Sequence, residues 1–164
     1  MRHGFHLAVI ALAISAANAQ LLDRMVAVVN KHVILESELD QAVRVEYLMQ
    51  GKPLDKVSSA DSVAVLDRLV DRALLEQQIL HPEMLAPTPE ELADQVKALR
   101  QQFPGAATDA GWKSLLATYD LTQQDIEDHL VSEVRELRFV DLRFRGLVRV
   151  DKKDISNYYQ QKFL

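Results

Sequence analysis

The segment that follows Thr122 constrains the fold of this chain more than any other. At 3.6 residues per turn, it predicts a helix of about six turns. Such a helix must pack its apolar face on other elements, so we expect it to be the centre of a helical core. The apolar residues step along it by four, four, three, three and four positions: Ile126, Leu130, Val134, Leu137, Val140 and Phe144.

Two helices are predicted before this segment, and proline or glycine marks their ends. Ser37 and Asp40 have the spacing of a capping box, so we expect a first helix over about 38–50. A second helix is expected to end at His81 and Pro82. Its apolar stripe consists of Leu66, Leu69, Val70, Ala73, Leu74 and Leu80.

Capping residues predict three more helices, over 89–103, after Asp109 and over 152–163. The short helix after Asp109 would contain Trp112 and Tyr119. With the helix after Thr122, this makes five to six helices. The residues that support the three starts are Thr88, Pro89 and Glu91 for the first, Asp109 for the second, and Asp151 with Asp154 for the third.

Short runs of β-branched residues predict a little strand structure. Residues 25–30 and 33–35 read as two strands around Asn30 and Lys31, and 148–150 is a further strand-like piece. An isolated hairpin is marginal in water, so these pieces either pair with each other or lie against the helices. The expected fold is therefore all-α, with five to six helices and a small two-stranded β element.

The first nineteen residues have the layout of a secretory signal. Arg2 is followed by an apolar run over 7–14 and by the small residues of 17–19. The run is too short to cross a hydrocarbon core of about 30 Å as a helix, which disfavours an uncleaved anchor and stable membrane insertion. We expect a signal peptide over 1–19 and one exported domain over 20–164.

Composition excludes several classes of function. The net charge of -5 provides no large basic face, so we expect no nucleic-acid partner. The chain has no cysteine, which excludes disulfides, thiolate nucleophiles and cysteine-ligated zinc. Outside the signal, His32, His81 and His129 lack the spacing of a zinc motif, and we expect no metal and no other cofactor.

No catalytic group stands out from the sequence. Acidic pairs such as Asp67 with Asp71, or Glu133 with Glu136, fit the solvated faces of amphipathic helices. Ser37 and Thr88 are explained as helix caps, without a base to activate them. A dense basic run fits a helix C-terminus, and alternatively attracts acidic clients or anionic lipid: Arg135, Arg138, Arg143, Arg145 and Arg149.

Taken in order, several of these segments resemble a known family. They are LLDRMVAVVNKHVILESELD, VLDRLVDRALLEQQIL, the start at Thr88, DIEDHLVSEVRELRFVDLRFR and VRVDKKDISNYYQQKF. The set resembles the N-terminal chaperone module of SurA and its parvulin-type periplasmic relatives, over about 22–163. The resemblance implies a periplasmic, mostly helical module that holds unfolded or nascent outer-membrane proteins. Family members often carry parvulin-type prolyl-isomerase domains, and this chain stops where the first would begin.

The predicted function is therefore that of an ATP-independent chaperone, and no phosphate-binding glycine loop occurs in the sequence. The alternatives are the leading part of a prolyl isomerase and a structural assembly module. The two adjacent tyrosines near the end suggest self-association. Candidate client-binding residues are aromatic and methionine-rich positions, for each of which core packing is the competing interpretation: Tyr47, Leu48, Met49, Phe103, Trp112, Tyr158 and Tyr159.

Overall fold

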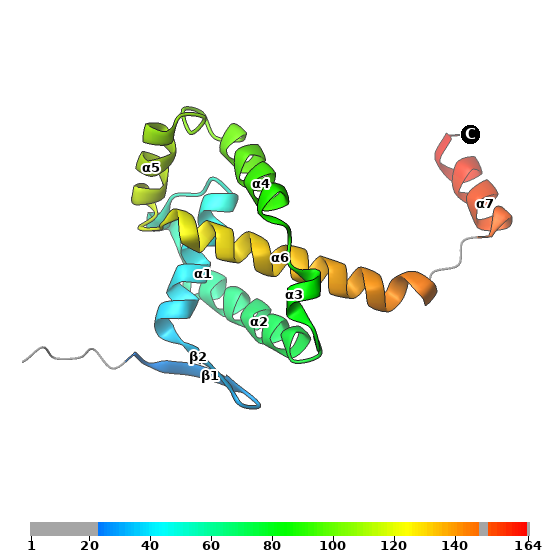
Figure 1. The fold of residues 1–164 in the computed structure, drawn as a ribbon, viewed down its shortest axis with the longest axis horizontal. Helices are drawn as coiled ribbons and strands as arrows, with labels where there is room; N and C mark the ends of the chain where they lie inside the picture. Colours follow the sequence, from blue (N-terminus) through cyan, green and yellow to red (C-terminus); the bar gives the residue numbers. More distant parts are fainter. Residues whose placement is uncertain (1–22, 148–150, 164) are drawn as a thin grey trace, which may run out of the picture.

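The computed structural model describes residues 23–147 and 151–163 (Figure 1). Within them, seven α-helices and a two-stranded hairpin confirm the expected fold class, with one short helix more than expected. The predicted signal and the strand-like piece at 148–150 lie outside the described residues. In chain order the elements are β1 (Met25–Val29), β2 (His32–Leu35), α1 (Glu36–Met49), η1 (Leu54–Lys56), α2 (Ser59–Glu76), α3 (Pro82–Leu85), α4 (Pro89–Gln101), α5 (Asp109–Thr118), α6 (Gln123–Phe144), η2 (Arg145–Leu147) and α7 (Lys152–Phe163).

The hairpin joins β1 and β2 through a tight turn at Asn30, whose φ of 57° is in the left-handed region that asparagine tolerates. Its strands are antiparallel, and a bulge at Val26 shifts the register. The side chain of Gln77, just after α2, donates to the Val29 carbonyl at 3.2 Å and accepts from Asn30 at 2.7 Å. The hairpin is thus stabilised by lying against a helix.

The start of α1 differs from the predicted capping box. The helix begins at Glu36, with Leu35 as N-cap and no side-chain cap. Instead of capping Asp40, the Ser37 hydroxyl donates to the Asp23 carboxylate, which also accepts the Ser37 backbone N–H at 3.1 Å. This hydrogen bond holds the pKa of Asp23 below its ordinary value. A residue ahead of the hairpin therefore performs the capping that was predicted for Ser37.

Other helix starts follow their local sequence. Thr88 with Glu91 and Thr122 with Asp125 form the predicted capping boxes of α4 and α6. Ser58 forms a third capping box, on α2, which was not predicted. The cap of α5 is Thr108 rather than Asp109, because the Thr108 hydroxyl accepts the Gly111 N–H at 3.1 Å.

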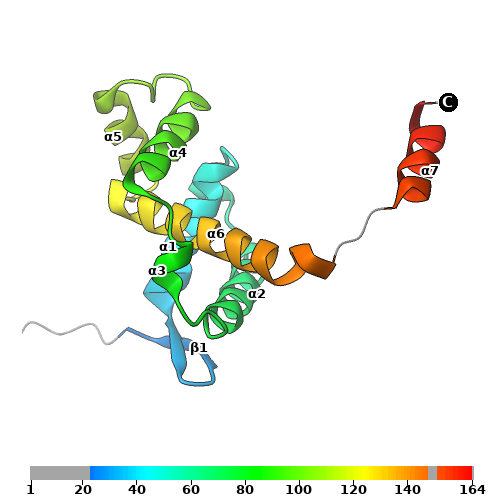
Figure 2. The same cartoon turned by 45° about the vertical axis from the view of Figure 1, so that its right-hand side comes forward.

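Helix α6 crosses the body and contacts α1, α2, α3 and α4 (Figures 1 and 2). The buried core lies around its first half, and the side chains with the least exposure there are Ile34, Leu48 and Ile126. The second half of α6 extends past the core. The prediction that its whole stripe is buried is wrong, because Leu137, Val140 and Phe144 are exposed.

The second helix also ends earlier than predicted. Helix α2 stops at Glu76, so Leu80 lies in the corner before α3 and is exposed, as is Leu74 within the helix. Val65, Leu69 and Ala73 form the buried stripe of α2 instead. The predicted stripe therefore shares Leu69 and Ala73 with the buried face and otherwise lies to one side of it.

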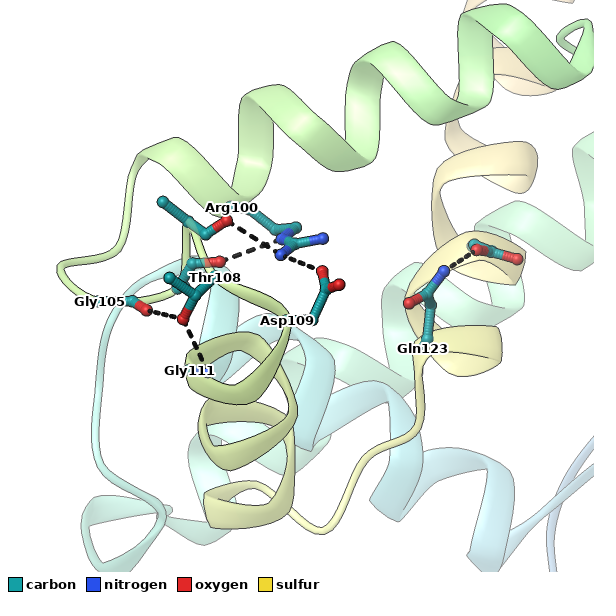
Figure 3. A network of polar contacts seen from close by, with 9 residues as sticks. Arg100, Gly105, Thr108, Asp109, Gly111 and Gln123 are labelled. Carbon is teal, nitrogen blue, oxygen red and sulfur yellow. Dashed lines mark hydrogen bonds and ion pairs between the residues drawn. The ribbon is translucent and has the colours of Figure 1, made fainter.

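Arg100 at the end of α4 holds the corner between α4 and α5 (Figure 3). Its guanidinium donates to the carbonyls of Ala106 and Ala107 at 3.0 and 3.1 Å and pairs with Asp109 at 2.8 Å. At Gly111, a Cβ would come within 1.8 Å of the Gly105 carbonyl oxygen, so only glycine fits. These contacts fix the corner between α4 and α5.

Helix α7 has the predicted bounds and the predicted cap. Asp151 accepts the backbone N–H groups of Lys153 and Asp154 at 2.8 and 2.9 Å. All its described side chains are exposed. Figures 1 and 2 draw it beyond the end of α6, on the far side of 148–150.

Candidate functional site

An open groove lies between α1, α2, α4 and α6 and has a volume of about 540 Å³. Its floor is apolar. The buried side chains of Val65, Leu69, Leu99 and Leu130 form most of it, and half-buried Met49 completes it at the end of α1. Four helices that diverge from one core leave this hollow between them, because each contributes only the edge of its apolar face.

Charged and amide side chains form the rim of the groove. Glu46 on α1 pairs with Arg68 on α2, and Arg72 on α2 pairs with Glu136 on α6. Partly exposed pairs of this kind contribute little to stability. They do hold opposite charges beside the floor, so the rim has both signs. Gln95 and Gln102 line the α4 side and add amide donors and acceptors.

His129 on α6 lines the groove and also a second hollow beside it. Burial lowers the pKa of His129 below its ordinary value, and the nearby Arg72 guanidinium lowers it further. Protonation of the imidazole is therefore disfavoured. Asp125, one turn earlier on the helix, caps α6 and accepts from Gln41 at 2.6 Å.

A second trough of about 360 Å³ continues along α6 on the α2 side. Leu75, Leu137 and Val140 supply its apolar lining, and it shares Arg72, His129 and Glu133 with the groove. Because the shared residues belong to both, the two hollows form one surface along α6. We call the first the four-helix groove and the second the α2–α6 trough.

The structure separates the seven candidate client-binding residues into three groups. Tyr47, Leu48 and Trp112 are buried in the core, so the prediction that they line an exposed surface is wrong. Met49 and Phe103 are half-buried, and only Met49 lines the groove. Tyr158 and Tyr159 are exposed on α7, away from both hollows.

Tyr47 has a structural role in place of the predicted binding role. Its hydroxyl donates to the Asp61 carboxylate at 2.8 Å, which ties the end of α1 to the start of α2. Hydrogen bonds from Ser58, and then from Tyr47, lower the pKa of Asp61 to about 2. This contact orients two of the helices that form the groove.

Sequence reasoning missed most of the groove. Ala98 on α4, Gln102 just after α4 and Arg68 on α2 line it, and none of them was predicted to. Their residue types are common on helix surfaces, so no local signal marks them. The exposure of the second half of α6 could have been predicted. The only helix predicted after it, α7, is short and rich in lysine, and such a helix is a poor candidate to cover an apolar stripe.

Much of the predicted basic run is engaged in ion pairs. Arg135 lies 3.5 Å from Glu76, Arg138 lies 2.8 Å from Glu91, and Arg145 pairs with Asp141. Arg138 also donates to the Ala86 carbonyl at 2.7 Å, which fastens α3 to α6. Arg149 lies outside the described residues. These pairs give the run a structural role.

The described residues contain no group of three or more His, Asp or Glu that could hold a metal ion. Across 23–147 and 151–163, none of the helices has the length and apolar character to cross a membrane.

Comparison of the chain with protein-family models, with curated proteins and with solved structures gives no match. The likeness to the SurA module therefore stays a prediction from the sequence, and the site is interpreted from its own geometry.

Proposed function

We propose that this protein is an ATP-independent periplasmic chaperone that holds unfolded outer-membrane proteins. The observation that supports this most is the four-helix groove, an open hollow between charged walls whose floor is formed by apolar side chains. A contiguous apolar surface with a polar rim is typical of an interaction site. The client class and the compartment come from the resemblance to the SurA module and its relatives.

The groove suits an extended chain better than a folded partner. Apolar and aromatic client side chains would cover Met49, Val65 and Leu99, and methionine adapts to side chains of varied shape. The backbone of an unfolded client needs hydrogen-bond partners when it leaves water, and the amides of Gln95 and Gln102 stand at the rim to supply them. Because ordering an unfolded chain costs entropy, each contact is weak and the client is released without ATP.

Light scattering of an unfolded outer-membrane porin, diluted from denaturant with and without the purified chain, tests the proposal. We expect an equimolar amount of chain to suppress aggregation. Ala98→Glu places a charge in the groove from an exposed position on α4 and should weaken suppression several-fold. Ala93→Glu makes the same change on the same helix at an exposed position outside the groove and is the matched control.

Two results would count against the proposal. The first is full aggregation of the porin in the presence of the wild-type chain. The second is equal suppression by Ala98→Glu and the wild type, which would show that the groove does not bind the client. Circular dichroism of both variants confirms that the helices are intact, so that a loss is attributed to the groove.

A further inference from the structure

Helix α7 presents an apolar face that nothing in the described structure covers. Ile155, Tyr159 and Phe163 follow one another at four-residue steps, and the rings of Tyr159 and Phe163 lie 5.4 Å apart. With Tyr158 beside them, these side chains are 57–63% exposed. A helix of twelve residues is marginal in water on its own, so α7 needs a partner surface to be stably helical.

The α2–α6 trough is a surface of matching length. It runs from His129 to Val140 on α6, which is about 17 Å at 1.5 Å per residue, and α7 is about 18 Å long. In its apolar lining, Leu137 is 64% and Val140 40% exposed, and Leu75 is half-buried. Helix-in-groove contacts use anchors at this spacing on one helix face.

Charge also separates between the two parts. Residues 23–144 carry 13 Lys and Arg against 22 Asp and Glu, a net charge of -9. Residues 145–163 carry 5 Lys and Arg against 2 Asp, a net charge of +3. Lys162 stands on the apolar face of α7, with its Nζ 5.7 Å from the Tyr158 ring, and Glu133 and Glu136 line the trough. An acidic body attracts a basic helix and repels a second acidic body, so charge favours α7, and not another body, as the occupant of the trough.

We propose that two copies of this chain form a dimer by reciprocal exchange, in which α7 of each copy lies in the α2–α6 trough of the other. The four apolar side chains of α7 can cover roughly 400 Å², and a contact removes a similar area from the facing surface around the trough. One exchanged helix then buries about 800 Å², the size of a weak contact, whereas two bury about 1,600 Å², the size of a stable interface. Exchange of an identical element is a low-cost route to a two-fold dimer.

Static light scattering after gel filtration measures the mass, and therefore the oligomeric state, of the protein. The wild type should be a dimer. Tyr159→Asp places a charge on the apolar face of α7 and should give a monomer with the body still folded, because no described side chain of α7 is buried. Gln160→Asp makes an equal charge change on the neighbouring, polar side of the helix and should remain a dimer.

A monomeric wild type would overturn the proposal, and so would a dimer that Tyr159→Asp leaves intact. A mixing experiment then identifies the occupant of the trough, since the chain has no native cysteine. Leu137→Cys and Tyr158→Cys chains of different mass are mixed and treated with a short thiol cross-linker. A cross-linked pair of unlike chains is expected.

The same two substitutions in one chain are the converse test. If that doubly substituted chain cross-links only within itself, α7 folds back on its own body and the exchange is wrong. The dimer does not depend on holding activity. Porin aggregation measured on the same samples tests the two proposals separately. A dimer that fails to hold a porin overturns only the proposed function. A monomer that holds a porin overturns only the exchange.

Discussion

The two halves of α6 differ although one apolar stripe runs through both. In the first half Leu130 is 8% exposed, while in the second half Leu137 is 64% exposed. The spacing, the residue type and the helix are the same. What differs is the surroundings, because the first half lies in the core among α1, α2 and α4 (Figure 2). The second half meets α2 and α4 through the ion pairs of Arg135, Glu136 and Arg138. Helical periodicity thus indicates which side chains share a face, and says nothing of whether another element covers it.

The sharpest measure of this difference is one substitution made in both halves. Leu130→Ala should lower the free energy of unfolding by about 3 kcal/mol, because it leaves a cavity in the core. Leu137→Ala should lower it by less than about 0.5 kcal/mol, as expected for an exposed position. Chemical denaturation in the Tyr159→Asp background measures both without a contribution from self-association. Equal costs would show that the second half is buried after all.

A second prediction compares the two ends of α6. Thr122→Ala removes the side chain that accepts the Asp125 N–H, and should lower the free energy of unfolding by about 1 kcal/mol. Asp141→Ala removes the pair with Arg145 at the other end, and should lower it by about 0.3 kcal/mol. Thermal unfolding of the two variants ranks them. The comparison fails if the Asp141 variant is the less stable one.

The smallest expected effect is a pH dependence at His129, where the two halves meet. Its pKa is lowered in the folded state, so below its ordinary value of about 6.5 the unfolded state binds a proton that the folded state does not. Stability should therefore fall as the pH falls from about 6.5 towards the folded pKa. His129→Gln should flatten this part of the stability profile, measured by urea denaturation at several pH values.

The control for this substitution is His81→Gln, at an exposed histidine before α3. It should leave the profile as it is in the wild type. A profile that is equally steep in wild type and His129→Gln would mean that another group causes the acid sensitivity.

Much of the fold could be predicted because its signals are local. Thr88 with Glu91, Thr122 with Asp125 and Asp151 cap helices through bonds that span three residues, so the neighbours in sequence are also the partners in space. Ser37 shows where this fails. Its partner is Asp23, fourteen residues earlier and across the hairpin, and no local pattern relates the two.

The candidate site was largely out of reach for the same reason. Met49, a candidate client-binding residue, lines the groove, but Tyr47 and Leu48 beside it are buried. Neighbours on a helix point about 100° apart, so one side chain of a run enters the core while the next lines a surface. Which one does so depends on where α2 and α4 pack.

The sequence by itself determined most of the helices, the starts of α4, α6 and α7, and the hairpin, because capping, turn chemistry and periodicity act over a few residues. Only the tertiary structure decided that Leu130 is core and Leu137 is surface, that four helices leave a groove, and that Tyr47 and Trp112 are buried. Burial depends on which elements far apart in the chain meet, and an apolar stripe is the same in sequence whether it is covered or left open.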